Sequence, residues 1–287
     1  MKTYIIIAVL MLSVVLDNAG YAACTGQGDP LKIMNYNVLV GFNGSKMYRE
    51  KYKNWIKERL PDIIGYQEMS KFTEDTFAAF AQSYGHSYTV FFDTGSCCPL
   101  AISSKYPISN IQKIGIGLHH GVITAEIEGY RLIVLHLDPS SWQQRLVEID
   151  KILAIIDSLP KEKRLMMGDF NSFSPVDADV YSTQQARLAR AIKAQSKNIN
   201  NGNFDYSVIQ RVIDAGYIDS WWEKHRKFTH TCPTNLHSTA GSADKLRIDY
   251  IWTSPDLKPE IKDCEVVYDG TTHILSDHYP VLLTLER

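Results

Sequence analysis

The stretch Ser276-Asp277-His278-Tyr279-Pro280 leads directly into the apolar, β-branched run Val281-Leu282-Leu283-Thr284-Leu285. This run predicts a buried strand close to the end of the sequence. In an extended chain the adjacent Asp277 and His278 would point in opposite directions, so burying both is costly unless a turn aims them into one site. The pair is therefore a candidate functional feature, and the alternative is a turn acid beside a surface histidine.

Several other apolar runs end in the same way, with a polar or ionisable side chain. The side chains at these predicted strand ends are those of Asn37, Glu68, His136, Asp169 with Asn171, and Asp249. A strand end holds a side chain rigidly, and oxygen ligands from separate strands suit Mg²⁺ better than zinc or copper. Each residue alone has a structural interpretation, such as a surface charge or a buried imidazole. Their recurrence favours a metal-assisted hydrolase.

The rest of the pattern alternates short β-branched blocks with longer helical stretches. Residues Tyr48–Leu60 and Ser141–Leu159 predict helices, each followed by a proline. Val122–Ile127 and Arg131–Leu135 predict a hairpin, and Arg247–Trp252 predicts a strand. Strands outnumber crossover helices, so a doubly wound parallel sheet fits poorly. We predict an α/β fold of four layers, an α/β-sandwich in which two mixed β-sheets pack face to face with helices outside.

The composition is that of a globular protein. The chain has 287 residues, of which 45% are hydrophobic and 22% charged, and a formal net charge of -2. This balance disfavours a stoichiometric nucleic-acid binder, although it leaves room for an enzyme with a local basic cleft. The sequence contains neither a linker-like segment nor an internal repeat, so one domain over residues 24–287 is expected.

Residues 1–23 have the layout of a secretory signal peptide. Lys2 precedes the apolar stretch Tyr4–Leu16, which is short for a membrane span, and small residues follow it at Ala22 and Ala23. We therefore expect a product that is secreted or exported to the periplasm or cell envelope. Two alternatives are a lipoprotein anchored through Cys24 and a buried N-terminal helix.

The sequence contains five cysteines: Cys24, Cys97, Cys98, Cys232 and Cys264. Without Cys24 the set is even, which in an oxidising compartment favours one or two structural disulfides. The adjacent residues Cys97 and Cys98 are not expected to bridge each other readily. The spacing of cysteines and histidines does not indicate a zinc site.

The motifs, taken in order, resemble those of the endonuclease/exonuclease/phosphatase superfamily. This superfamily includes pancreatic-type deoxyribonucleases, AP endonucleases, neutral sphingomyelinases and inositol-polyphosphate phosphatases. The resemblance covers nearly the whole predicted mature chain. It rests on Asn35-Tyr36-Asn37, Gln67-Glu68, His136-Leu137, Gly168-Asp169-Phe170-Asn171, Arg247-Ile248-Asp249-Tyr250 and Ser276-Asp277-His278-Tyr279-Pro280.

The resemblance implies a divalent metal and a phosphate-binding site. Glu68 is similar to the metal-binding glutamate of the family, and Asn37 and Asp277 are implied to lie near the ion. His136 and Asn171, together with Asn37, are similar to groups that hold the scissile phosphate. The implied cofactor is Mg²⁺, with Mn²⁺ or Ca²⁺ as alternatives.

The resemblance also implies how water is activated. Asp169 is similar to the acid that orients or deprotonates the attacking water. His278, paired with Asp249, is similar to the imidazole that acts as a general base or as an electrostatic stabiliser. The sequence leaves open whether Asp169 or His278 takes the proton.

One departure from the family concerns an arginine that contacts phosphate in many relatives. The corresponding region here reads Leu118-His119-His120-Gly121. Either His119 or His120 replaces that arginine, or the contact is missing and the two histidines lie on a strand edge.

The expected function is that of an exported, divalent-metal-dependent phosphoesterase, nuclease-like or phosphatase-like. Its substrate is a nucleic acid, a lipid headgroup or a small phosphate ester, and no obligate protein partner is implied. One alternative is a sphingomyelinase-type phospholipid hydrolase, and another is a catalytically silent binding module on the same fold. A serine hydrolase is disfavoured because the sequence contains no Gly-x-Ser-x-Gly motif.

Overall fold

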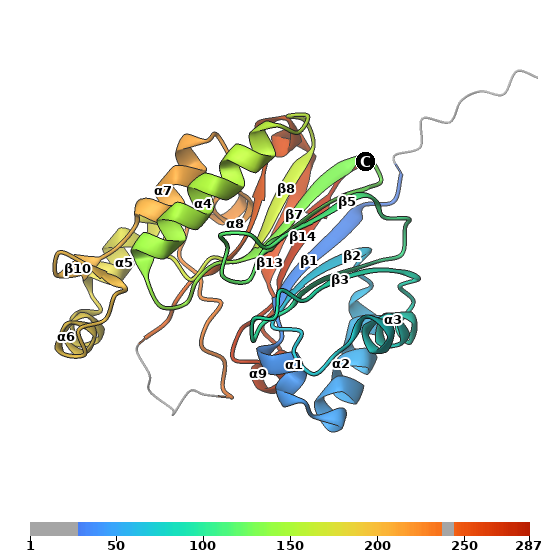
Figure 1. Ribbon diagram of the computed structural model, residues 1–287, viewed down its shortest axis with the longest axis horizontal. Coiled ribbons are helices and arrows are strands. Elements are labelled where there is room, and N and C mark those ends of the chain that lie inside the picture. Colours follow the sequence, from blue (N-terminus) through green and yellow to red (C-terminus); the bar gives the residue numbers. More distant parts are fainter. Residues whose placement is uncertain (1–27, 237–243) are drawn as a thin grey trace, which may run out of the picture.

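The computed structural model describes residues 28–236 and 244–287, in which two six-stranded mixed sheets pack face to face (Figure 1). In spatial order, the first sheet contains β13 (Ile261–Val266), β14 (Val281–Leu285), β1 (Leu31–Asn37), β2 (Ile63–Gln67), β4 (Leu100–Ser104) and β3 (Tyr88–Phe92). The second contains β11 (Ile218–Asp219), β12 (Asp249–Thr253), β8 (Arg164–Asp169), β7 (Tyr130–His136), β6 (Val122–Ile127) and β5 (Ser109–Ile114). The pairs β1–β2 and β7–β8 are parallel, and the other pairs are antiparallel.

The central strands bury both of their faces, which explains their nearly continuous apolar sequences, whereas the edge strand β5 is exposed. In β1, Leu31 and Ile33 belong to the core between the sheets, whereas Met34 and Tyr36 belong to the core under the helices. The two sheets approach closely at Gly65 of β2, because a Cβ atom there would lie 3.0 Å from Met167 Cε. A larger side chain at this position would push the sheets apart.

Helices cover the outer face of each sheet, as the sequence predicted (Figure 1). The first sheet packs against α2 (Lys46–Arg59) and α3 (Glu74–Gln82), and the second against α4 (Trp142–Asp157) and α7 (Ser207–Asp214). The α4 helix begins where expected, because the Ser141 hydroxyl accepts a hydrogen bond from the Gln144 N–H. The four-layer α/β-sandwich predicted from the sequence is therefore confirmed.

The remaining elements are short and lie mostly in the connections. They are α1 (Leu39–Asn43), α5 (Ala178–Ser182), α6 (Gln185–Lys193), α8 (Ser220–His225), α9 (Thr272–Leu275), the 3₁₀ helices η1 (Pro175–Asp177) and η2 (Pro255–Glu260), and a hairpin of β9 (Ile199–Asn200) and β10 (Asn203–Phe204).

Two expectations from the sequence were wrong. The predicted strand Arg247–Trp252 begins only at Asp249, and the buried Arg247 side chain instead forms ion pairs with Asp177 and Asp219. Cys97 and Cys98 are joined by a disulfide, because bends over residues 95–98 turn both side chains to the same side. An extended segment would have pointed them apart. Among the cysteines that the structure describes, Cys232 and Cys264 form no disulfide.

The predicted signal peptide and Cys24 lie outside the described residues. Within residues 28–236 and 244–287, no helix is both long enough and apolar enough to cross a membrane.

Candidate active site

Strand register places three of the predicted site residues side by side in the second sheet. His136 at the end of β7 pairs with Asp169 at the end of the parallel strand β8. Asp169 in turn pairs with Asp249 at the start of the antiparallel strand β12. The first sheet contributes Asn37 at the end of β1 and Glu68 immediately after the end of β2. Two sheets therefore deliver polar side chains from their strand ends.

The turn before β14 connects the two sheets at this site. The Ser276 hydroxyl donates to the backbone carbonyl of Asn37 at 2.7 Å and accepts from the His278 N–H at 3.2 Å. The ring of His278 then reaches the second sheet, where its Nδ1 lies 2.8 Å from Asp249 Oδ2. The turn thus removes the objection that Asp277 and His278 would point apart in an extended chain.

Asp169 lies at the centre of the cluster. Its Oδ1 accepts the Asn171 N–H at 2.8 Å, and its Oδ2 accepts Asn37 Nδ2 at 3.1 Å. The same Oδ2 lies 3.5 Å from His136 Nε2 and 3.8 Å from His278 Nε2. The longer separation exceeds a direct hydrogen bond, so His278 Nε2 remains available to a water molecule or a phosphate oxygen.

Glu68 is held by an amide and by an unusual backbone turn. Asn37 Nδ2 donates to Glu68 Oε1 at 3.1 Å, and the Val40 N–H donates to Oε2 at 3.0 Å. The α1 turn, which supplies Val40, has positive φ throughout, including at Val40 and Phe42. L-residues rarely adopt this left-handed conformation, and such strain is typical of functional sites.

The Asn37 amide is oriented by the backbone and by two carboxylates. Its Oδ1 accepts the Leu39 N–H at 3.1 Å, which leaves Nδ2 facing Glu68 and Asp169. An amide nitrogen is a donor rather than a metal ligand. The geometry therefore supports a role for Asn37 in orienting the two carboxylates, and its expected role near the ion stays a prediction.

The His278–Asp249 pair retains a proton at neutral pH. Burial alone lowers the pKa of His278, but the negative charges of Asp249, Cys232 and Asp169 outweigh it and hold that pKa well above its usual range. Burial raises the pKa of Asp249 to about 6. The geometry favours a charged imidazolium that is fixed through Nδ1 and donates through Nε2.

His136 behaves in the opposite way. Burial, reinforced by the charge of His278, lowers the pKa of His136 to about 3, so its imidazole is neutral. Burial also raises the pKa of Asp169. The site thus contains one charged and one neutral imidazole on either side of one carboxylate, and such a divergence is typical of catalytic sites.

Asn171 retains donor capacity for a ligand. Its Nδ2 donates to the Leu137 carbonyl at 3.1 Å, which uses one of two amide hydrogens. Asn171 also has a positive φ of 47°. This arrangement is compatible with the expected contact to phosphate.

The oxygen ligands expected for Mg²⁺ come from Glu68 and Asp277. Asp277 keeps a quarter of its side chain exposed, and Ser276 connects it to the strand that bears Asn37. Among the described residues, these two acids do not share a cluster of three or more close ligands. Protein sites for Mg²⁺ commonly supply one or two carboxylates and leave the other positions to water and substrate oxygens.

The two adjacent histidines have separate surroundings. His119 Nδ1 lies 2.9 Å from Asp138 Oδ2, and 43% of its side chain is exposed. His120 is buried and stacks on His136, with ring centroids 4.3 Å apart. His119 is the more accessible of the two and is therefore the better candidate for the missing arginine's contact.

Sequence reasoning missed one residue that supports the site. The Thr231 hydroxyl accepts both the Ile248 and the Asp249 N–H groups at 3.1 Å and so fixes the start of β12. A lone threonine far from Asp249 in sequence carries no motif, so only the fold reveals this contact.

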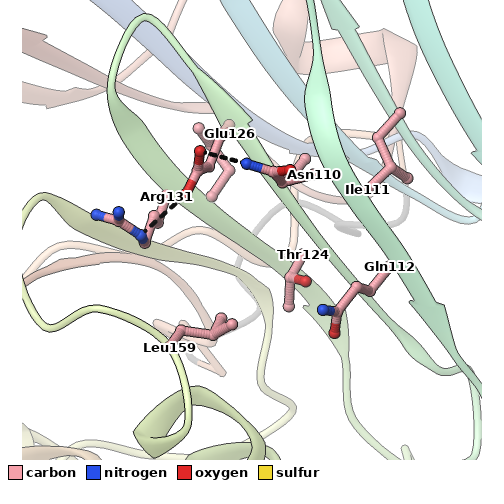
Figure 2. A pocket seen from close by; sticks show the side chains of 9 residues that line it. Asn110, Ile111, Gln112, Thr124, Glu126, Arg131 and Leu159 are labelled. Carbon is pink, nitrogen blue, oxygen red and sulfur yellow. Dashed lines mark hydrogen bonds and ion pairs between the residues drawn. The ribbon is translucent and has the colours of Figure 1, made fainter.

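The hollow drawn in Figure 2 is not part of this cluster. It has a volume of about 350 Å³ and is lined by residues of β5, β6 and β7 together with Leu159. Three of its polar residues pair with one another, since Glu126 accepts from Asn110 at 2.7 Å and lies 3.1 Å from Arg131 (Figure 2). None of the catalytic candidates lines it.

Comparison with solved structures finds proteins of the same fold. An AP endonuclease from Archaeoglobus fulgidus superposes with a TM-score of 0.69 at 19% identity, covering 89% of this chain and 99% of that one. The 3′ phosphatase NExo from Neisseria, bound to a product DNA hairpin, superposes with a TM-score of 0.68 at 22% sequence identity. The match covers 90% of this chain and 100% of that one. The 3′-5′ exonuclease NExo from Neisseria meningitidis superposes with a TM-score of 0.67 at 23% sequence identity, and the match covers the same shares of the two chains.

These likenesses concern the fold, and the sequence itself identifies the family. No curated protein sequence matches this chain. The model of the Endonuclease/Exonuclease/phosphatase family, however, matches residues 34–278, which include every predicted site residue. The chain therefore belongs to the endonuclease/exonuclease/phosphatase family, whose hydrolases act on phosphoester bonds.

Proposed function

We propose that this protein is an exported, Mg²⁺-dependent phosphoesterase that cleaves nucleic acid with water as the nucleophile. The observation that carries the catalytic part is the arrangement of His278, Asp249 and Asp169, whose ligand atoms lie within 4.8 Å of one another. Export is supported by the layout of residues 1–23 alone.

Within this proposal, Asp169 orients the attacking water. Its Oδ2 faces both histidines and its Oδ1 is fixed by the Asn171 N–H, so a water bound to Oδ2 has a defined position. Protonated His278 stabilises negative charge on the phosphate through Nε2, while Asp249 holds the ring. Neutral His136 and the remaining Asn171 hydrogen donate to phosphate oxygens.

Glu68 and Asp277 would hold the divalent cation, because they are the carboxylates of the site with oxygens outside the Asp169 cluster. When bound, the cation would neutralise charge on the phosphate and on the leaving oxygen. Asn37 keeps Glu68 and Asp169 in a fixed relation through its amide nitrogen.

An aromatic pocket beside the site supports a nucleic-acid substrate. The pocket measures about 550 Å³ and includes Tyr268, Tyr279 and His230, together with Lys227 and Lys245. The His230 and Tyr268 rings stack at 5.2 Å, and Tyr279 follows His278 in the sequence. Stacking surfaces beside cations bind single-stranded bases. The Neisseria phosphatase of similar fold is bound to a product DNA hairpin, which agrees with this choice.

Removing divalent cations is expected to lower hydrolysis of bis-p-nitrophenyl phosphate at least tenfold, because a metal in such sites supplies several kcal/mol of charge stabilisation. The measurement compares the mature protein before and after EDTA treatment, followed by added Mg²⁺, Mn²⁺ or Ca²⁺. Activity that survives complete chelation would contradict the metal-dependent mechanism. Inactivity towards every phosphoester would favour the silent binding module.

DNA is expected to be cleaved faster than sphingomyelin, because the aromatic pocket offers stacking surfaces that a lipid headgroup does not use. The measurement compares release from single-stranded DNA, duplex DNA and sphingomyelin vesicles at equal phosphate concentration. Replacing Tyr268 with alanine should weaken DNA binding by about 1–3 kcal/mol and leave hydrolysis of the small ester unchanged. Faster cleavage of sphingomyelin would select the lipid-hydrolase alternative.

A further inference from the structure

The loop between β3 and β4 brings two cysteines against a buried histidine. Cys97 is exposed and Cys98 is buried, and His120 lies just before β6. One ligand atom from each of the three residues lies within 4.8 Å of the others. Sulfur and imidazole nitrogen are the ligands that bind zinc and other thiophilic metals.

His120 has a nitrogen without a partner in this cluster. The residue is 1% exposed, and its Nδ1 lies 3.0 Å from Ser96 Oγ. Its Nε2 is buried and has no hydrogen-bond partner within residues 28–236 and 244–287. The same Ser96 oxygen accepts the Cys98 N–H at 3.3 Å. In the tautomer with its proton on Nδ1, the His120 ring donates to Ser96 and Nε2 carries the lone pair that a cation needs.

The imidazole of His120 is in the correct protonation state for a ligand. Burial, with the neighbouring His136 and His119, lowers the pKa of His120 to about 3. A buried acceptor without a partner is costly, and a bound cation would satisfy it.

We propose that reduction of the Cys97–Cys98 bridge creates a binding site for a thiophilic divalent cation of the Zn²⁺ class, held by both thiolates and His120 Nε2. A dithiol supplies two electrons and two protons to the bridge and becomes a disulfide itself. The cation then displaces the two thiol protons. In an oxidising compartment the bridge keeps the site closed.

The site adjoins the catalytic cluster. Cys98 also shares a second group with Glu68 and His136, whose ligand atoms again lie within 4.8 Å of one another. A cation bound to Cys98 would therefore lie close to Glu68, the predicted Mg²⁺ ligand. It follows that Zn²⁺ inhibits the reduced enzyme, a consequence that rests on the proposed function.

Cobalt spectroscopy tests the site without reference to activity. The mature protein is reduced, freed of reductant under nitrogen and titrated with Co²⁺. We expect about one equivalent to produce the thiolate-to-cobalt absorption of a tetrahedral site, and Zn²⁺ to abolish it. The oxidised protein is the matched control, because it has the same sequence but lacks the two thiolates, and it should give no such band.

Variants assign the ligands. Cys98→Ser should remove the band, and His120→Ala should weaken Co²⁺ binding at least tenfold. Cys232→Ser should retain the band and the Co²⁺ affinity of the wild type. The absence of a band in the fully reduced wild type, with its thiols verified by titration, would overturn the proposal. A band that survives in Cys98→Ser but disappears in Cys232→Ser would also overturn it. Because the oxidised and reduced wild type are compared directly, a poorly folded variant does not decide the outcome.

A second measurement separates this site from the proposed function. Zn²⁺ should inhibit Mg²⁺-supported hydrolysis of bis-p-nitrophenyl phosphate in the reduced wild type at least tenfold more strongly than in reduced Cys97→Ser. A cobalt band in a protein without phosphoesterase activity would leave the metal site standing and reject the proposed function. Hydrolysis by a protein that gives no cobalt band would support the proposed function and reject the metal site.

Discussion

His278→Ala is expected to lower kcat for phosphoester hydrolysis by about 100-fold or more, the range for a positioned acid-base group. The His278 ring is buried and fixed by Asp249 at 2.8 Å, and its Nε2 lies 3.8 Å from Asp169. Truncation removes the donor and also leaves the Asp249 carboxylate buried without its partner. The measurement is steady-state kinetics with bis-p-nitrophenyl phosphate at saturating Mg²⁺.

The effect should fall mainly on kcat, because a charge that is needed most in the transition state contributes little to ground-state binding. His225→Gln is the matched control, since this half-buried histidine on α8 bonds the Cys264 carbonyl and has no place in the cluster. It should retain near-native kcat. Near-native activity in His278→Ala, with unchanged Mg²⁺ affinity, would remove this imidazole from the mechanism.

Much of this site could be predicted because strand ends are easy to locate in the sequence. Asp169 and Asp249 each border a short apolar run, and strand pairing then places them directly opposite each other. His278 required more than periodicity. Its position depends on the turn held by the Ser276 hydroxyl. The periodic pattern alone did not decide between a functional pair and a turn acid beside a surface histidine, and the resemblance to the family motif favoured the functional pair.

The parts that could not be predicted depend on contacts between distant segments or on unusual backbone. The left-handed turn at Leu39–Asn43 has no sequence signal, because most of its residues are not glycine. The Cys97–Cys98 bridge depends on bends that pattern rules do not describe. The orientation of Asn37 follows from one backbone N–H, that of Leu39, so its amide faces the carboxylates with nitrogen rather than oxygen.

Arg247 shows how a motif residue can serve the fold rather than the chemistry. Its side chain is 1% exposed and lies 2.7 Å from Asp177, with Asp219 on its other side. Burial lowers the pKa of Arg247, but the two aspartates outweigh it and keep the guanidinium charged. Asp177 belongs to η1 and Asp219 to β11, so the Arg247 cation links these two elements to the segment that precedes β12.

Arg247→Met is therefore expected to lower the free energy of unfolding by about 3–5 kcal/mol, because it leaves buried carboxylates without a counter-charge. Urea unfolding followed by circular dichroism measures this change as a lower midpoint with an unchanged slope. Arg190→Met is the matched control. Arg190 also pairs with an aspartate, Asp244, but 61% of its side chain is exposed. The control should change stability by less than about 1 kcal/mol.

The source of the destabilisation can be tested by removing a carboxylate charge that Arg247→Met leaves unpaired. If the cost comes from the unpaired carboxylates, adding Asp177→Asn to Arg247→Met should recover part of the lost stability, even though Asp177→Asn alone should destabilise the wild type. Arg247 also lies over the Tyr250 ring, at 4.8 Å from its centroid. If lost packing on that ring were the main cause, the double variant would be no more stable than Arg247→Met, and the electrostatic account would be wrong.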